Sequence, residues 1–278
     1  MFDVGVALQL GILTNVLVPV IVCELFVSTQ MEGCCVGIPS IFLRVSGCNL
    51  TCCFKNSICD TPYASFNPEK SIYKSMDELI EAFKKIRKEY PNVHHLVITG
   101  GEPLLYKDAL EVFLKEITTE DLVTTIETNG TLPPMENDLI SLYSISPKLS
   151  TSMCLETAKD KLTQKQIDHH NKTRINIENL SKYLFIPYVD VQLKFVYSGK
   201  ECISEIDDIL NRIAINQTHM PYQECLNYLN SLVMLMPEGY DEETLKKSRI
   251  ECVNKCIERG WRYTDRLHII VWGNKRGV

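Results

Sequence analysis

Cysteines are concentrated in one short stretch of this 278-residue chain. Four of its twelve cysteines lie close together, at Cys48, Cys52, Cys53 and Cys59. Thiolates bind soft metals, and an iron–sulfur cluster usually takes four of them. A cluster held by only three cysteines, Cys48, Cys52 and Cys59, leaves one iron with an open coordination site, where a reaction can take place. Zinc would need a second ligand pair. Cys252 and Cys256 form such a pair, but their spacing on a predicted helix is more typical of core packing.

A second motif follows a predicted strand at residues 95–99. It reads Thr99-Gly100-Gly101-Glu102-Pro103. The two glycines allow a ligand to approach the backbone closely, and Glu102 can accept a hydrogen bond from an ammonium group. Ligands of parallel α/β folds collect at the carboxyl ends of strands, so this motif is a candidate binding site.

These motifs need a scaffold, and strand-like and helix-like segments alternate from residue 70 onward. The capping box Ser75-Met76-Asp77-Glu78 starts one helix, and further helices are predicted at 108–117, 203–213 and 241–259. Strands are predicted at 95–99, 122–128, 139–146, 189–197, 232–236 and 267–272. Repeated strand–helix units favour an α/β fold, with a mostly parallel sheet and helices outside it. We expect a single domain over 18–278, with a candidate insertion around 151–186.

The composition is that of a globular protein, with 45% hydrophobic and 23% charged residues, which excludes collagen-like and disordered classes. A net charge of −6 argues against a nucleic-acid partner. An apolar run over 4–22 is interrupted by Gln9, Asn15 and Pro19, and no Lys or Arg precedes it. We therefore expect neither a signal peptide nor a membrane span, but a cytoplasmic protein. Its first strand is predicted at 19–26, after an extension at 1–17 of unassigned role.

Further motifs continue the pattern along the chain. They are Gln30-Met31-Glu32-Gly33, Phe42-Leu43-Arg44, Cys59-Asp60-Thr61, Glu127-Thr128-Asn129-Gly130, Ser146-Pro147-Lys148 and the tail Trp272-Gly273-Asn274-Lys275-Arg276-Gly277-Val278. Together with the cysteines and residues 99–103, they resemble the radical S-adenosylmethionine (SAM) superfamily. Within it, the chain resembles the 7-carboxy-7-deazaguanine synthase family of queuosine and 7-deazapurine biosynthesis. The resemblance implies a partial (β/α)6-type barrel and a homodimer.

The resemblance also implies cofactors and site residues. By this resemblance Cys48, Cys52 and Cys59 hold a [4Fe-4S] cluster whose fourth iron binds SAM, and Thr61 ligates Mg²⁺. The implied SAM positions are Gly101, Glu102, Ser146, Pro147, Lys148, Leu235, Met236, Pro237 and Glu238, with Lys194 facing the same site. The implied substrate positions are Thr29, Gln30, Met31, Glu32, Arg44, Thr99, His268 and Val278.

The implied activity is that of a carbon–nitrogen lyase. It contracts the ring of 6-carboxy-5,6,7,8-tetrahydropterin to 7-carboxy-7-deazaguanine with loss of ammonia, and SAM acts as a regenerated cofactor. An external donor such as flavodoxin supplies the electron. Arg44 suits this substrate because its planar guanidinium can pair bidentately with a carboxylate. The resemblance implies no nucleic acid and no membrane as a partner.

Two positions depart from the family pattern. The usual spacing is CxxxCxxC, whereas six residues separate Cys52 from Cys59 here, and Cys53 is an alternative second ligand. The family's Gln-Gly-Glu-Gly has become Gln30-Met31-Glu32-Gly33. A Met side chain, where Gly lets the backbone approach the pterin, can shift the placement of the substrate.

Two other functions fit parts of the pattern. A glycyl-radical activase would use the same cluster on a protein substrate, but it should lack Arg44, Thr61 and the tail as a set. A cysteine-rich metal-binding interaction module would need only the cysteines, and it would leave the motifs at 99–103, 127–130 and 146–148 unexplained. Zinc without iron in the purified protein would support the module.

Overall fold

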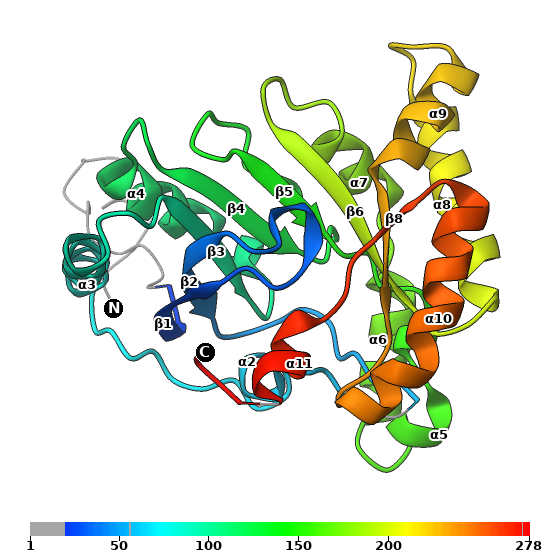
Figure 1. Cartoon of the computed structure of the whole chain (residues 1–278), viewed down its shortest axis with the longest axis horizontal. Helices are drawn as coiled ribbons and strands as arrows, with labels where there is room; N and C mark the ends of the chain where they lie inside the picture. The colour runs from blue at the N-terminus through cyan, green and yellow to red at the C-terminus, as the bar shows by residue number, and fades with distance from the viewer. Residues whose placement is uncertain (1–19, 56, 274) are drawn as a thin grey trace, which may run out of the picture.

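The computed structural model describes residues 20–55, 57–273 and 275–278. One sheet contains eight strands in chain order: β1 (Val22–Thr29), β2 (Pro39–Val45), β3 (His95–Gly100), β4 (Val123–Thr128), β5 (Leu142–Ile145), β6 (Asp190–Tyr197), β7 (Val233–Pro237) and β8 (Arg262–Tyr263). β1 is antiparallel to β2, and every later neighbouring pair is parallel. Strands β1 and β8 lie at the two edges of the sheet, and within the described residues they do not pair with each other. The sheet is therefore an open, partial barrel (Figure 1).

Helices connect the successive parallel strands, except β4 and β5, which a segment without a helix joins. The helices are α2 (Pro62–Ser65), α3 (Met76–Glu89), α4 (Lys107–Ile117), α5 (Leu155–Ala158), α6 (Gln164–Thr173), α7 (Ile177–Tyr183), α8 (Glu201–Asn216), α9 (Tyr222–Leu232), α10 (Glu242–Arg259) and α11 (Leu267–Trp272), with short 3-10 turns η1 (Gly33–Cys35), η2 (Pro103–Tyr106) and η3 (Ser150–Ser152). Figure 1 shows α3 and α4 together at one side of the sheet, and α8, α9 and α10 at the other. The α/β fold with a mostly parallel sheet is confirmed.

Strand residues divide between two faces of the sheet because successive side chains point in opposite directions. On β2, Ile41, Leu43 and Val45 are fully buried in the core beneath the helices, whereas Phe42 and Arg44 face a cavity on the other face. Each fully buried aliphatic side chain contributes about 1.5–3 kcal/mol. One face of the sheet therefore packs against the helices and stabilises the fold, and the other face lines the cavity.

Local signals set the ends of two long helices. Ser75 begins α3 as predicted, since its side chain accepts a hydrogen bond from the Glu78 amide at 3.2 Å. Asp241 caps α10 with Thr244 in the same way. Gly260 ends α10 in the left-handed region at φ 67°, which a residue without Cβ adopts at low cost.

One predicted strand was wrong, one helix was not predicted, and two strands have different bounds from those predicted. The predicted strand at 267–272 is helix α11, because Arg262–Tyr263 already occupies the edge beside β7 and the chain then turns toward the cavity. A short apolar run does not distinguish a strand from a buried helix. Helix α9 was not predicted at all. The strand predicted at 139–146 is shorter, at Leu142–Ile145, and the first strand begins at Val22 rather than 19.

The candidate insertion at 151–186 holds α5, α6 and α7 between β5 and β6. The predicted extension at 1–17 lies outside the described residues. In the described part of the chain, no helix has the length and apolar character needed to cross a membrane.

Candidate active site

A cavity of about 540 Å³ lies at the carboxyl ends of the parallel strands, within the range of small-molecule sites. Nineteen of the predicted site residues line it: Thr29, Gln30, Met31, Glu32, Arg44, Cys48, Cys52, Cys59, Thr61, Thr99, Gly101, Ser146, Lys148, Lys194, Met236, Pro237, Glu238, His268 and Val278. Three predicted SAM residues do not: Glu102, Pro147 and Leu235. Segments from both ends of the chain therefore meet at one place.

The long cysteine loop folds back on itself. Cys53 and Ile58 pair as an antiparallel bridge, and the Cys59 amide donates to the Cys52 carbonyl at 3.0 Å. This hairpin pairing of Cys53 with Ile58 brings Cys52 and Cys59 together. Cys53 is fully buried on the other side, in a cluster with Met153 and its neighbours, and it does not line the cavity.

These three cysteines fit an iron–sulfur cluster. Their thiols line one cavity, and the Leu50 amide donates to Cys48 Sγ at 3.4 Å. Burial raises the pKa of the Cys48 thiol to about 12 and that of Cys52 well above its usual value, so iron must displace protons on binding. Among the described residues no three His, Cys, Asp or Glu side chains converge on a single ion. Three thiols on one cavity are a soft donor set of the kind that iron–sulfur clusters use.

The glycine motif after β3 holds the start of the cysteine loop. A Cβ on Gly101 would lie 2.0 Å from the Gly47 carbonyl oxygen and 2.5 Å from that of Ala64. The Glu102 amide donates to the Gly47 carbonyl at 2.8 Å. Backbone packing, rather than the approach of a ligand, is thus what requires glycine at position 101.

Glu102 lies away from the cavity, contrary to the expectation that it meets an ammonium group. Its fully buried carboxylate accepts hydrogen bonds from Leu104 N at 3.1 Å, Thr128 Oγ1 at 2.8 Å and Asn129 N at 2.8 Å. Protein donors satisfy both oxygens, so Glu102 joins the ends of β3 and β4. Leu235 is fully buried in the core.

Three of the residues expected to bind SAM, Ser146, Lys148 and Glu238, form a polar wall of the cavity. Lys148 Nζ donates to Ser146 Oγ at 2.8 Å. Glu238 Oε1 is buried against the cavity and finds no hydrogen-bond donor among the described residues. A buried carboxylate oxygen without a donor is costly, and a ligand hydroxyl or amine would satisfy it. This wall fits a polar cofactor.

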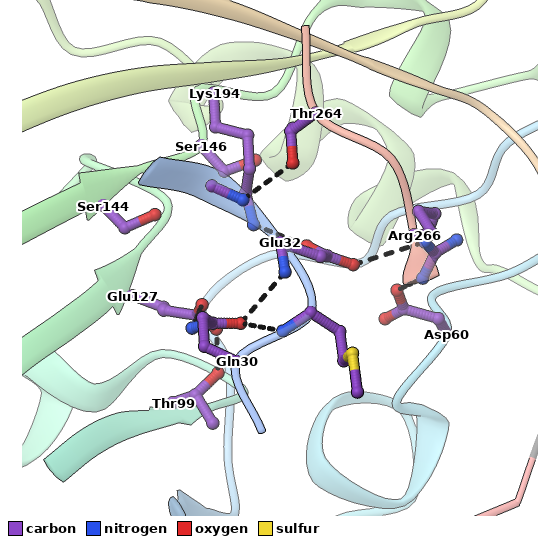
Figure 2. Close-up of polar contacts among 12 residues, drawn as sticks. Gln30, Glu32, Asp60, Thr99, Glu127, Ser144, Ser146, Lys194, Thr264 and Arg266 are labelled. Atoms are coloured by element: carbon purple, nitrogen blue, oxygen red, sulfur yellow. Dashed lines mark hydrogen bonds and ion pairs between the residues drawn. The ribbon is translucent and has the colours of Figure 1, made fainter. Parts of the chain in front are cut away.

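An ion-pair network crosses the cavity, as Figure 2 shows. Glu32 pairs with Lys194 at 2.5 Å and with Arg266 at 3.4 Å, and its carboxylate lies 3.8 Å from the His268 ring; Arg266 also pairs with Asp60. Burial alone would raise the pKa of Glu32, but Lys194, Arg266 and His268 together hold it well below its usual range. Glu32 is therefore an anion at neutral pH.

A second chain of polar contacts lies beside it (Figure 2). Gln30 Nε2 donates to Glu127 Oε1 at 3.1 Å, and Thr99 Oγ1 donates to Glu127 Oε2 at 2.7 Å. Gln30 Oε1 accepts from the amides of Met31 and Glu32 at 2.9 and 3.2 Å. The half-buried Met31 is held by its backbone at the cavity wall, so its side chain adds bulk there.

Arg44 uses only its Nε–H donor in a hydrogen bond to another described residue. Its Nε pairs with Glu24 at 2.5 Å, while its Nη groups make no hydrogen bond within the described residues. Two parallel donors therefore remain for a carboxylate in the cavity. Glu24 in turn contacts Arg276 of the tail, whose guanidinium lies 3.7 Å from the centre of the Tyr63 ring.

Thr61 precedes α2, and its hydroxyl lies 3.4 Å from Cys59 Sγ. It is therefore at the boundary between the cysteine loop and the substrate side. His268 and Val278 enter from α11 and the tail, and Figure 1 shows α11 beside α2 with the C-terminus close by. Burial lowers the pKa of His268 despite the nearby Glu32, which favours the neutral ring.

Comparison with known proteins decides the family. The family model for the Radical SAM superfamily matches residues 43–213. The chain is 36% identical over 252 residues to a 7-carboxy-7-deazaguanine synthase of Halobacterium salinarum, covering 90% of each protein. It is 34% identical over 258 residues to that of Rhodopirellula baltica, covering 93% of this chain and 88% of the relative. The chain belongs to the 7-carboxy-7-deazaguanine synthase family.

Members of this family are lyase-type radical SAM enzymes, and so is this chain. The crystal structure of QueE from Escherichia coli has a similar fold, with a TM-score of 0.53 at 20% identity, covering 88% of this chain and 93% of that one. The glycyl-radical activase and the metal-binding module are not favoured, because synthases match nearly the whole chain.

Sequence reasoning missed three polar residues of this synthase-family site. Asp60 and Glu127 stood in the quoted motifs without a role, although their position at a strand or cysteine-loop end was a usable signal. Arg266 was overlooked entirely. Its neighbourhood was predicted to be a strand, and only the tertiary structure brings its guanidinium to both Glu32 and Asp60.

Proposed function

We propose that this cavity converts 6-carboxy-5,6,7,8-tetrahydropterin to 7-carboxy-7-deazaguanine with loss of ammonia. One observation carries the proposal. One cavity is lined both by three cysteines, Cys48, Cys52 and Cys59, and by Arg44, whose guanidinium can bind a carboxylate. A radical enzyme acting on a carboxylated pterin needs both within one enclosed space.

Cys48, Cys52 and Cys59 would hold the [4Fe-4S] cluster, and Ser146, Lys148 and Glu238 would contact SAM. The bound cluster and SAM would supply the radical chemistry for hydrogen-atom abstraction at C6 of the substrate, with SAM acting as a regenerated cofactor. The chain's task is to orient C6 toward that radical and to exclude water. Glu102 would not contact SAM; its hydrogen bonds to Thr128 and Asn129 hold the ends of β3 and β4 in place.

The substrate side would recognise charge and ring separately. The free Nη groups of Arg44 would donate two parallel hydrogen bonds to the substrate carboxylate, and these bonds set its plane. The loop from Thr29 to Glu32 faces the ring, and Thr99 supports it through Glu127. Because Glu32 is held as an anion, it accepts hydrogen bonds from ring N–H groups. We assign no general base.

Mg²⁺ would bind at Thr61, in contact with the substrate carboxylate. Mg²⁺ prefers oxygen ligands and often keeps several waters, so one hydroxyl plus a substrate oxygen is a reasonable protein contribution. There it would hold the carboxylate and steer the rearrangement. We also infer a homodimer and an external electron donor such as flavodoxin.

Substitution of Arg44 and Thr61 tests the substrate side. Arg44→Lys should keep the cluster and raise the KM for the pterin about 10–100-fold, because one charge-assisted hydrogen bond of about 1.5–3 kcal/mol is lost.

Thr61→Ala should keep the cluster and lower Mg²⁺-dependent turnover. The control is Arg212→Lys, on the exposed face of α8. Unchanged kinetics in Arg44→Lys, or full activity in Thr61→Ala, would remove that residue from the site.

A further inference from the structure

Residues 150–173, containing η3, α5 and α6, support the cysteine loop from outside the cavity. Cys53 pairs with this segment on both sides, since its amide donates to the Ser152 carbonyl at 2.7 Å and its carbonyl accepts from the Cys154 amide at 2.6 Å. Thr157 Oγ1 donates to the Lys55 carbonyl at 2.8 Å. Cys53 also packs in a small buried apolar cluster with four residues of this segment: Met153, Ala158, Leu162 and Ile167.

His170 on α6 makes the central contact. Its fully buried ring lies against the part of the loop between the first two cluster cysteines, where Nδ1 accepts from the Thr51 amide at 3.3 Å. Its Nε2 lies 2.9 Å from Ser152 Oγ, whose hydroxyl donates to the Leu149 carbonyl at 2.6 Å. An amide can only donate, so Nδ1 is the acceptor and Nε2 carries the proton. One neutral tautomer therefore satisfies every contact.

The electrostatic surroundings agree with this tautomer. Burial lowers the pKa of His170 to about 4, and Arg174 and Lys148 act in the same direction. The adjacent His169 holds a second point of the loop, since its Nε2 lies 3.1 Å from the Asn49 carbonyl oxygen. Two successive histidines thus contact the loop at Asn49 and at Thr51.

We propose that His170 is a positioning residue for the iron–sulfur cluster, and that residues 150–173 are the support required by the long cysteine loop. Six residues between Cys52 and Cys59 give this loop more conformational freedom than the short family spacing, and that freedom opposes cluster binding. Outer contacts of this kind commonly change metal affinity 10–100-fold. The inference rests on the proposed cluster at Cys48, Cys52 and Cys59 but not on the substrate.

Two variants separate the contacts of His170. His170→Asn keeps an acceptor near Nδ1 for the Thr51 amide, whereas His170→Gln keeps only a donor near Nε2 for Ser152. In anaerobically reconstituted protein, we expect iron release to a ferrous chelator to be about tenfold faster in His170→Gln and His170→Ala than in the wild type. His170→Asn should stay close to the wild-type rate. The reduced cluster's electron paramagnetic resonance spectrum should change in the same order.

The exposed His219→Ala on the α8–α9 connection is the control and should release iron at the wild-type rate. Thermal unfolding of each apo-protein measures any general loss of stability. Wild-type iron release in His170→Gln, with or without a lower melting temperature, would overturn the inference, and so would equal release by the Asn and Gln variants. If His170→Ala does not fold, the Asn and Gln pair still decides. A wild-type protein that binds no cluster would instead refute the proposed function.

Discussion

Cys52 and Cys53 are neighbours in sequence with opposite surroundings. Cys52 lines the cavity with Cys48 and Cys59, whereas Cys53 packs among apolar side chains behind the loop. The difference follows from the hairpin, in which successive side chains point to opposite sides. Chain spacing alone left both thiols open as the second cluster ligand, and only the pairing of Cys53 with Ile58 and Met153 distinguishes them.

Matched alanine variants test this assignment. Cys52→Ala should lose the brown cluster and all SAM cleavage. Cys53→Ala should keep the cluster and lose only about 1 kcal/mol of unfolding free energy, because a small buried group is removed from a packed cluster. Iron content and cluster absorbance after reconstitution measure the difference. Loss of the cluster in Cys53→Ala with retention in Cys52→Ala would reverse the assignment.

Glu32 makes stability depend on pH. Its pKa is lowered below the usual 4.5 by Lys194, Arg266 and His268. The stabilisation is therefore complete above about pH 4.5 and is lost as the pH falls through the lower, folded-state pKa. At pH 7, Glu32→Gln should cost about 3 kcal/mol, since Lys194, with 6% of its side chain exposed, loses its partner.

Urea denaturation of both proteins at pH 7 and at pH 3 measures this effect. The gap in unfolding free energy between wild type and Glu32→Gln should narrow at pH 3. Glu178→Gln on α7, whose partner Lys182 is exposed, should not change stability measurably at either pH. A gap that widens on acidification would contradict the assignment of Glu32 as the stabilising anion.

At the scale of elements, sequence periodicity predicted the helices and strands that form the outer core. Strands β3, β4, β6 and β7 and helices α3, α4, α8 and α10 lie close to their predicted positions because each buries a regular apolar face. Elements that face the cavity were harder to predict. Helix α11 carries His268 inward, and its short apolar run matches a strand equally well.

The roles of glycines also need tertiary structure. Gly100 and Gly101 were recognised as a motif, but the backbone of the neighbouring β2 loop is what excludes a Cβ there. Similarly, the motif position of Glu102 was noted, but its burial among amides and hydroxyls depends on how β3 meets β4. A sequence pattern identifies such a residue without saying which neighbour it contacts.

Gly101→Ala tests the contact between the glycine motif and the cysteine loop. The added Cβ would overlap the Gly47 carbonyl, so we expect a loss of about 1–3 kcal/mol in unfolding free energy and lower iron retention. Gly37→Ala is the matched control. Its φ of 92° costs about 1–2 kcal/mol, but its Cβ meets no atom within 4 Å, so iron content should not change. Full iron retention in Gly101→Ala would contradict the proposed coupling.

At the scale of the whole molecule, the open sheet collects loops from the entire chain at one rim. The strands follow in chain order, and the loops after β2, β3, β4, β5, β7 and β8 line the same cavity, together with α11 and the tail from the far end of the sequence. The strand–helix alternation made this convergence predictable. The ion pairs of Arg266 with Glu32 and Asp60 were not, because they join residues more than 200 positions apart.

Turnover by the iron-reconstituted protein tests the central claim most directly. The protein would be incubated anaerobically with SAM, dithionite, Mg²⁺ and 6-carboxy-5,6,7,8-tetrahydropterin, and the products identified by mass spectrometry. We predict 7-carboxy-7-deazaguanine without stoichiometric loss of SAM. If 5′-deoxyadenosine forms without the deazaguanine, the result supports the radical chemistry but not the substrate. Met31 is then the first residue to test as the cause of a different substrate specificity. If neither product forms despite a complete cluster, the proposed function is contradicted.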